Sequence, residues 1–475
     1  MAISLENNNM LVQHETKSWE DVDETEGAAN GISGSHKHDN DSNDPLNWPY
    51  WRRIYIALFV AASGFGAQFS ASVINPAYVA MAADLHITVE QASYVTTSFV
   101  LVGGIIPMFV VPFSNVYGRR ILYLIFTAIA FVANIGRALA PTYSGVIAGS
   151  VFNGVGSSIP LGIGAATICD LFPQGQRGFY IGIYTVAVTN GPHVAPIIGG
   201  YLADTLGWRW CFWIPAFLQA ALWLISIFTF PETLYSRKDY RKPQRHTYIL
   251  KLLFNGKILD RKIRAKDFWL SFRMIKYAAV TLPCIYYMTV NTYGSILFAV
   301  TGSRICKQVW GFDTAQTGLF MGVPLTVGCM IGEGLAGWVS DVIINTYAHR
   351  HDGYRKPEAR LYLLPLTLLL PIGTATYGYC VQYHKPWIAA AVCMAVSGCG
   401  TQIATTVVYT YCTDSYKPQS SEIGAIINLF KSGASAARLV QLPHILTISQ
   451  SSASTLVSTP FRSVRQWASM CPSAH

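Results

Sequence analysis

The stretch PFSNVYGRRILYLIF, residues 112–126, places two adjacent arginines, Arg119 and Arg120, between two long apolar runs. Residues 92–113 before them and residues 121–136 after them carry no charged side chain. A helix of about 20 apolar residues is long enough to cross the hydrocarbon core of a bilayer. The stretch therefore predicts two membrane-spanning helices joined by a short turn that carries two positive charges.

The composition indicates the same class of protein for the whole chain. Of its 475 residues, 51% are hydrophobic and 12% are charged, whereas soluble domains carry about 25% charged residues. We therefore expect an all-α polytopic membrane protein. The predicted spans are residues 54–80, 92–114, 121–140, 143–168, 178–202, 211–230, 277–302, 318–341, 361–380, 388–412 and, interrupted by Lys431 and Arg438, 423–442.

The distribution of basic residues predicts the topology. With the N-terminus in the cytosol, the predicted inner loops up to residue 422 hold 23 Lys or Arg, and the outer loops hold five. The outer five are Arg137, Arg209, Arg304, Lys307 and Lys385. This bias favours a cytosolic N-terminus. The net charge of +9 gathers in the inner loops while the first 50 residues are acidic, so we do not expect nucleic acid as a partner.

The chain divides into five predicted segments. A disordered cytosolic tail covers residues 1–44, and a first six-helix half covers residues 45–230. A basic cytosolic linker, residues 231–276, mixes aromatic and basic residues and is predicted to lie as an amphipathic helix on the inner leaflet. An incomplete second helical half, residues 277–442, precedes a tail, residues 443–475, that is too polar to span a membrane.

The two halves share a short motif. Ser114 and Asn115 lie at the predicted inner end of the second span, and Ser340 and Asp341 lie at the matching place in the second half. Internally duplicated transporters have related halves of this kind. The echo therefore favours a transporter built from two parallel repeats.

Four stretches resemble the major facilitator superfamily, and within it the fungal drug:proton antiporters with twelve spans. They are SNVYGRR (114–120), NGPHVAPIIGG (190–200), PET (231–233) and GEGLAGWVSD (332–341). The resemblance implies the major facilitator fold, with two six-helix halves that rock to give alternating access, here with the last one or two helices incomplete. It also implies an antiporter motif in span five, formed by Gly191, Pro192, Pro196, Gly199 and Gly200.

The chain departs from the family pattern at several positions. Asn115 stands in place of an aspartate, Val111 and Ala195 stand in place of glycines, and Ser150 stands in place of an arginine of span four. The chain also departs from the pattern after Phe430, which we interpret as a change of reading frame or splicing that removes span twelve and damages span eleven.

The turn at Gly118 is a candidate conformational latch. Glycine permits a tight turn, and Arg119 and Arg120 can contact helix C-terminal carbonyls and a neighbouring carboxylate. Because Asn115 has no carboxylate, a latch in the first half has to borrow one, whereas Asp341 retains a carboxylate in the second half. The alternative is that the two arginines only orient the helix in the membrane.

Span five is a candidate gate or permeability seal. Its glycines permit close approach of neighbouring helices, and its prolines bend the backbone. The alternative is ordinary packing of a kinked helix.

Glu333 is the candidate for proton or cation binding, because a charge deep in a membrane is costly and usually functional. His193 is a second candidate, while Asp170 is expected to cap the loop DLFPQGQRG. Glu333 can alternatively be a structural residue that the flanking glycines pack against another helix. Polar and aromatic groups of spans one, seven and ten are predicted to line a cavity for an amphipathic organic molecule. They are Gln68, Asn75, Asn291, Tyr293, Gln402 and Tyr409.

Together these features predict a proton-coupled exporter of small organic compounds in the plasma membrane. Its expected partners are the substrate, protons and the lipid bilayer, and we expect a monomer. No nucleotide-binding glycine loop, metal cluster or nucleophile motif is present in the sequence, so we expect neither a cofactor nor an enzyme. A symporter for a sugar, a polyamine or another nutrient, and a truncated membrane protein that does not transport, remain the alternatives.

Overall fold

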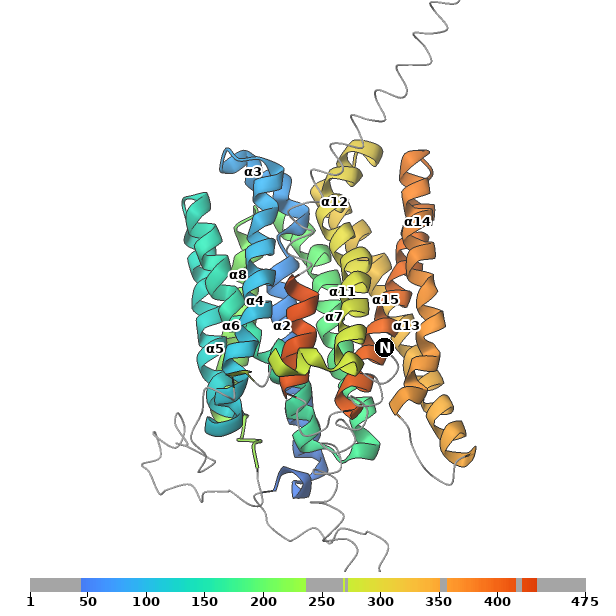
Figure 1. The fold of residues 1–475 in the computed structure, drawn as a ribbon. Helices are drawn as coiled ribbons and strands as arrows, with labels where there is room; N and C mark the ends of the chain where they lie inside the picture. Colours follow the sequence, from blue (N-terminus) through green and yellow to red (C-terminus); the bar gives the residue numbers. More distant parts are fainter. Residues whose placement is uncertain (1–43, 236–267, 270–271, 351–356, 416–420, 434–475) are drawn as a thin grey trace, which may run out of the picture. The chain divides into compact units, whose positions relative to one another are not determined.

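A computed structural model of the chain describes residues 44–235, 268–269, 272–350, 357–415 and 421–433 (Figure 1). Within these residues the regular structure is entirely helical. The helices of the first half are α2 (Tyr50–Ser72), α3 (Tyr78–Asp84), α4 (Val89–Tyr117), α5 (Arg119–Leu139), α6 (Tyr143–Leu171), α7 (Gln174–Thr205) and α8 (Trp210–Thr229). Those of the second half are α11 (Ala278–Asn291), α12 (Leu297–Ile305), α13 (Thr314–Arg350), α14 (Leu369–Gln382), α15 (Trp387–Ser415) and a helix over residues 421–433.

Eight helices within the described residues are long and apolar enough to cross a membrane. They cover Tyr50–Asp84, Val89–Tyr117, Arg119–Leu139, Tyr143–Leu171, Trp210–Thr229, Thr314–Gly337, Glu358–Gln382 and Trp387–Thr413. The predicted all-α polytopic class is therefore confirmed. The long α7 also contains the predicted fifth span. The seventh predicted span, residues 277–302, is a helix interrupted by one π-helical segment, η4 (Thr292–Ile296), and a second such segment, η5 (Cys306–Trp310), follows α12.

The ends of α4 follow from local sequence. Thr88 caps its N-terminus by accepting a hydrogen bond from Gln91 N at 3.1 Å, and Thr88 N donates to Gln91 Oε1 at 2.9 Å. This capping box satisfies backbone donors that the first helical turn leaves without partners. Gly118 ends the helix with φ 96°, so α5 begins at the next residue.

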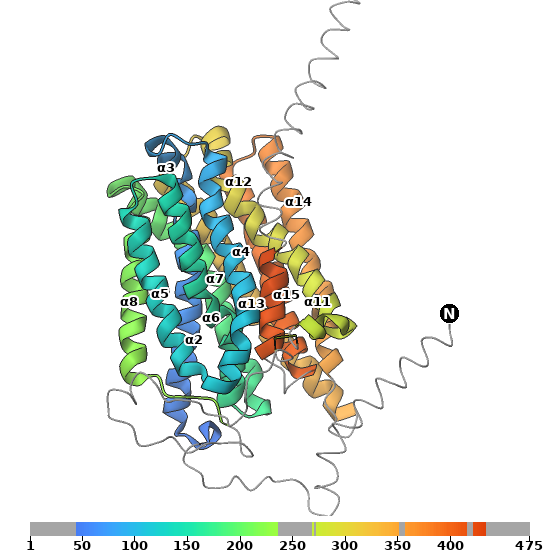
Figure 2. The same cartoon turned by 60° about the vertical axis from the view of Figure 1, so that its left-hand side comes forward.

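Close helix packing in the first half depends on glycine. Gly154 of α6 faces α4 so closely that a Cβ there would lie 2.7 Å from Phe99 O. Gly156, two residues later, points to the opposite side of α6, where a Cβ would overlap Ala130 N of α5. Small residues of this kind let helices in a membrane protein come into backbone contact. The helix α6 is thereby held between α4 and α5, an arrangement that Figures 1 and 2 both show.

The structure corrects two sequence-based placements. Arg137 is not in a loop but lies in the last turn of α5 with its side chain buried, because neighbouring polar groups accept its hydrogen bonds. Asp341 is not at a helix end, because α13 continues to Arg350. The predicted N-terminal tail, most of the amphipathic linker and the polar C-terminal tail lie outside the described residues.

Candidate functional site

The turn at Gly118 joins α4 to α5 without an intervening loop. Its φ of 96° lies in the region that residues with a Cβ rarely adopt, so glycine is required here. The turn places the free backbone N–H groups of the first turn of α5 next to Glu232, which follows α8. Arg119 N and Arg120 N donate to the two Glu232 carboxylate oxygens at 2.8 and 3.1 Å. A carboxylate at this position satisfies the N-terminal donors of α5 and interacts favourably with its dipole.

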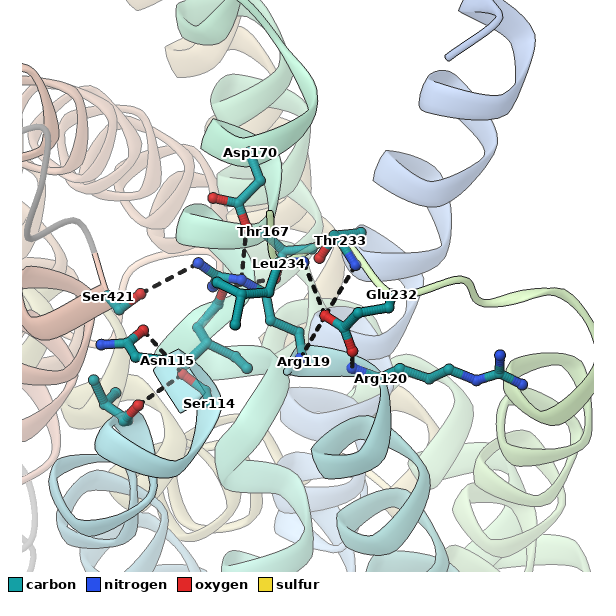
Figure 3. Close-up of polar contacts among 12 residues, drawn as sticks. Ser114, Asn115, Arg119, Arg120, Thr167, Asp170, Glu232, Thr233, Leu234 and Ser421 are labelled. Carbon is teal, nitrogen blue, oxygen red and sulfur yellow. Dashed lines mark hydrogen bonds and ion pairs between the residues drawn. The ribbon is translucent and has the colours of Figure 1, made fainter. Parts of the chain in front are cut away.

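Glu232 is held by its own loop as well. Its Oε1 also accepts hydrogen bonds from Thr233 N at 3.0 Å and Leu234 N at 2.8 Å. Burial raises the pKa of the Glu232 carboxyl, and the N–H donors and the nearby Arg119 oppose this rise. The PET sequence therefore connects the end of α8 to the start of α5 (Figure 3).

The Arg119 side chain points away from Glu232 and into the interior. It is 3% exposed, and its Nε lies 2.6 Å from Asp170 Oδ2 at the end of α6. Asp170 is thus an ion-pair partner rather than the loop cap that the sequence predicted. Arg120 takes a different direction and donates from Nη2 to Ile227 O of α8 at 3.0 Å. Figure 3 shows the two arginines diverging from the turn.

Two contacts link this turn to the second half of the chain. Asn115 Nδ2 donates to Glu422 Oε1 at 2.9 Å, and Arg119 Nη2 donates to Ser421 Oγ at 3.4 Å. Ser421 and Glu422 begin the helix over residues 421–433 and are buried. Asn115 therefore contacts a carboxylate from the other half of the molecule. We call this group, Asn115, Arg119, Asp170, Ser421 and Glu422, the inter-half cluster.

The sequence did not predict that Glu232 and Glu422 are partners of this turn. Glu232 was noted only as part of a family-like triplet, and Glu422 was not noted at all. Both are acidic residues beside predicted spans, which was a usable signal, but their partners are more than one hundred residues away in the chain. Asp341 lies on α13, and its side chain lies outside the part of the structure that is described.

The glycines and prolines of α7 face two different helices. A Cβ at Gly191 would lie 2.9 Å from Phe65 O of α2, and a Cβ at Gly199 would overlap Val73 O just beyond α2. On the other side, a Cβ at Gly200 would lie 3.0 Å from the Cα of Gly318 on α13. The motif therefore packs α7 tightly between one helix of its own half and one helix of the second half.

A cavity lies between the two halves, next to the same part of α7. Pro192, His193 and Pro196 line it from α7, and Gln68 and Asn75 line it from the first span. The second half contributes Asn291, apolar side chains that include Phe298 and Met321, and Lys431. The structure thus brings together three of the six predicted lining residues, Gln68, Asn75 and Asn291, with His193.

The other predicted lining residues lie elsewhere. Tyr293 is 42% exposed, and Tyr409 is buried against Tyr287 with ring centroids 5.8 Å apart. Gln402 is buried on α15 and donates to Glu333 Oε2 at 2.8 Å.

Glu333 lies between three helices. It accepts hydrogen bonds from Gln402 and Thr406 of α15, and a Cβ at Gly182 of α7 would lie 2.8 Å from its Oε1. Gly332 permits the close approach of α13 to Cys399 of α15. Glu333 is thus hydrogen-bonded within its own half and faces α7 of the first half. A change in the distance between the halves would therefore alter the surroundings of its carboxyl group.

The first half also contains a buried polar cluster around Arg137 that the sequence did not predict. Arg137 Nη1 donates to Asn134 Oδ1 at 3.1 Å, and the guanidinium lies 4.1 Å from the ring centroid of Phe212. Asn134 accepts from Asn153 Nδ2 at 3.1 Å and donates to Gln219 Oε1 at 2.8 Å. These side chains hold α5, α6 and α8 together through hydrogen bonds between amide groups, a hydrogen bond from the Arg137 guanidinium and a cation–π contact.

Comparisons with known proteins agree with this architecture. The family model described as Major Facilitator Superfamily matches residues 60–438. The MFS-type transporter penM of Penicillium rubens is 30% identical over 410 residues, covering 84% of this chain and 79% of that protein. The efflux pump radE of Floropilus chiversii is 24% identical over 389 residues, covering 79% of this chain and 71% of that protein.

A solved structure has the same fold. It is a bacterial homologue of the human lysosomal transporter Spinster, in an inward-facing and unoccupied conformation. It superposes with a TM-score of 0.56 at 15% sequence identity, and the match covers 82% of each chain.

Proposed function

Because this chain belongs to the major facilitator superfamily and is a membrane transporter rather than an enzyme, we propose that it exports small organic compounds in exchange for protons. The observation that carries this proposal is a cavity lined by both halves, with the inter-half cluster joining the same two halves elsewhere. Alternating access requires such contacts to break and re-form as the halves rock. One relative that covers most of this chain is named an efflux pump, which supports export.

The inter-half cluster acts in this proposal as the latch of one state. Asn115 and Arg119 cross to Glu422 and Ser421, while Asp170 holds the Arg119 guanidinium inside the first half. Opening at this end exchanges two hydrogen bonds for contacts with water, which costs little net free energy. The latch can therefore be released by modest binding energy from a substrate or a proton.

Two groups are proposed to carry the exchanged proton. His193 lines the cavity, and Glu333 lies at the junction of α7, α13 and α15, where it senses the spacing of the halves. The antiporter motif of α7 forms the seal between the two halves. We propose further that the N-terminus lies in the cytosol, which the basic residues of the predicted inner loops favour. We also propose that the protein is a monomer and that it resides in the plasma membrane.

Flux through proteoliposomes with an imposed pH gradient tests this function. The full chain is assayed with a panel of organic cations, organic anions, polyamines and sugars. We expect export that follows the proton gradient, and loss of this coupling in Glu333→Gln or in His193→Gln. If the flux of every transported compound were independent of the pH gradient, this result would contradict antiport. Gradient-driven movement in the opposite direction identifies a nutrient symporter, and absence of any flux identifies a protein that does not transport.

A further inference from the structure

The charged group of the central cavity is basic. Lys431, on the helix over residues 421–433, lines the cavity together with His193. Among the described residues that line it, none is Asp or Glu. The sequence treated Lys431 only as an interruption of span eleven, although a lysine inside a membrane-spanning helix is costly and usually functional.

Two neighbours of Lys431 hold its helix against α4. Asn428 Nδ2, three residues earlier, donates to Gly103 O of α4 at 3.0 Å. Ser432 packs so closely on α4 that a Cβ at Gly104 would overlap it. Residues spaced by three or four positions share one face of a helix. Asn428 and Ser432 therefore hold one face of this helix against α4, and the adjacent Lys431 lines the cavity between the two halves.

The rest of the cavity wall is neutral and amphipathic. The wall includes the amide residues Gln68, Asn75 and Asn291 and the apolar residues Phe99, Phe298, Leu161 and Met321. His193 is 3% exposed, and its Nε2 has no hydrogen-bond partner among the described residues. Rings and apolar side chains favour an aromatic or aliphatic body, and a buried polar nitrogen favours a polar group on the ligand.

We propose that the substrates of this cavity are amphipathic organic anions with a single carboxylate, for which Lys431 supplies the opposite charge. A charge-assisted hydrogen bond from a partly buried ammonium to a carboxylate is strong, whereas an organic cation placed there meets a like charge in a medium of reduced dielectric. Lys431 selects the charge of the ligand, and His193 with the amide groups orients it. The inference rests on the proposed transport function, since it names the substrate class of the same cavity.

Equilibrium binding to the purified full chain tests the inference. The probes are 2-naphthoate, 2-naphthamide and 2-(aminomethyl)naphthalene, which share one ring system and differ in charge. We expect the wild-type protein to bind 2-naphthoate about tenfold or more tightly than the other two probes. This preference should vanish in Lys431→Gln, persist in Lys431→Arg, and reverse toward the amine in Lys431→Glu.

The control is Lys385→Gln, which removes an equal charge from an exposed residue after α14 and should leave the preference unchanged. Equal binding of the three probes to the wild-type protein overturns the inference without the need for any variant. A carboxylate preference that survives in Lys431→Gln overturns it as well. Because binding is measured without a gradient, failure of proton coupling leaves this result unaffected and is detected only by the flux assay.

Discussion

Single residues at the Gly118 turn have separate backbone and side-chain roles. The backbone N–H of Arg119 is bound by Glu232, while its guanidinium is paired with Asp170 and reaches Ser421. The sequence identified the arginines and the glycine from their place between apolar runs. It could not identify Asp170 as the partner of Arg119, because a carboxylate near the end of a span has several possible partners. Only the packing of α5 on α6 selects one of them.

Replacement of Gly118 by alanine should destabilise the protein by about 1–3 kcal/mol, because its φ of 96° and ψ of 169° lie in a region that essentially only glycine adopts. Thermal unfolding of the purified protein measures the change. Gly136→Ala is the matched control, since this glycine lies in α5 with open space around it and alanine favours a helix. A Gly118→Ala protein as stable as Gly136→Ala would contradict the role assigned to the turn.

The two ion pairs of the described residues should differ in their contribution to stability. Asp170→Asn leaves the buried Arg119 guanidinium without a carboxylate partner at 2.6 Å, and we expect a loss of about 3 kcal/mol. Asp84→Asn removes the partner of Arg209, where both side chains are more than 40% exposed, and should cost about 1 kcal/mol or less. Unfolding midpoints of the two variants compare the pairs directly. Equal losses would show that the burial of Arg119 has no energetic consequence.

At the scale of elements, α7 of the first half packs against helices of both halves. Its motif was recognised in the sequence, but the pattern allowed either a gate or simple packing. The structure shows that Gly199 faces the end of α2 while Gly200 faces α13. Sequence could not assign these faces, because consecutive glycines carry no amphipathic signal, and the partner of each is set by tertiary packing.

Gly199→Ala should force α7 away from the end of α2, because the new Cβ overlaps a backbone oxygen that cannot move independently. Overpacking of this kind costs about 1–3 kcal/mol. Thermal stability and flux should both fall, whereas Gly378→Ala, in an open position on α14, should leave both near the wild-type values. Unchanged flux in a Gly199→Ala protein of wild-type stability would exclude α7 as the seal.

At the scale of the whole molecule, the transporter depends on contacts that form between its halves in one state and break in another. The hydrogen bond of Asn115 with Glu422 joins the two halves, and we propose that it is such a contact. The two residues are 307 positions apart in the chain. No local pattern couples them, and the partial family motif at Asn115 suggested only that a carboxylate had to come from elsewhere.

Asn115→Asp should weaken the latch, because it places a second carboxylate beside Glu422 in a buried site. We expect hydrogen exchange in residues 112–120 to accelerate about fivefold or more, in line with a coupling on the order of 1 kcal/mol. The double variant Asn115→Asp/Glu422→Gln restores one amide and one carboxylate with their positions exchanged, and should return exchange to the wild-type rate. Fast exchange that persists in the double variant would contradict the pairing.

The sequence by itself determined the membrane class and the approximate places of the helices, because a bilayer requires long apolar runs that can be recognised directly in the sequence. Its short motifs also gave the family resemblance. It also pointed to Gly118 and Arg119 as a candidate latch and to the α7 motif as a candidate seal. Only the tertiary structure decided which carboxylates meet Arg119 and Asn115, that Arg137 is buried, and that Lys431 lines the cavity. Polar residues inside a membrane protein are positioned by partners on other helices, and that pairing is set by helix packing rather than by local sequence.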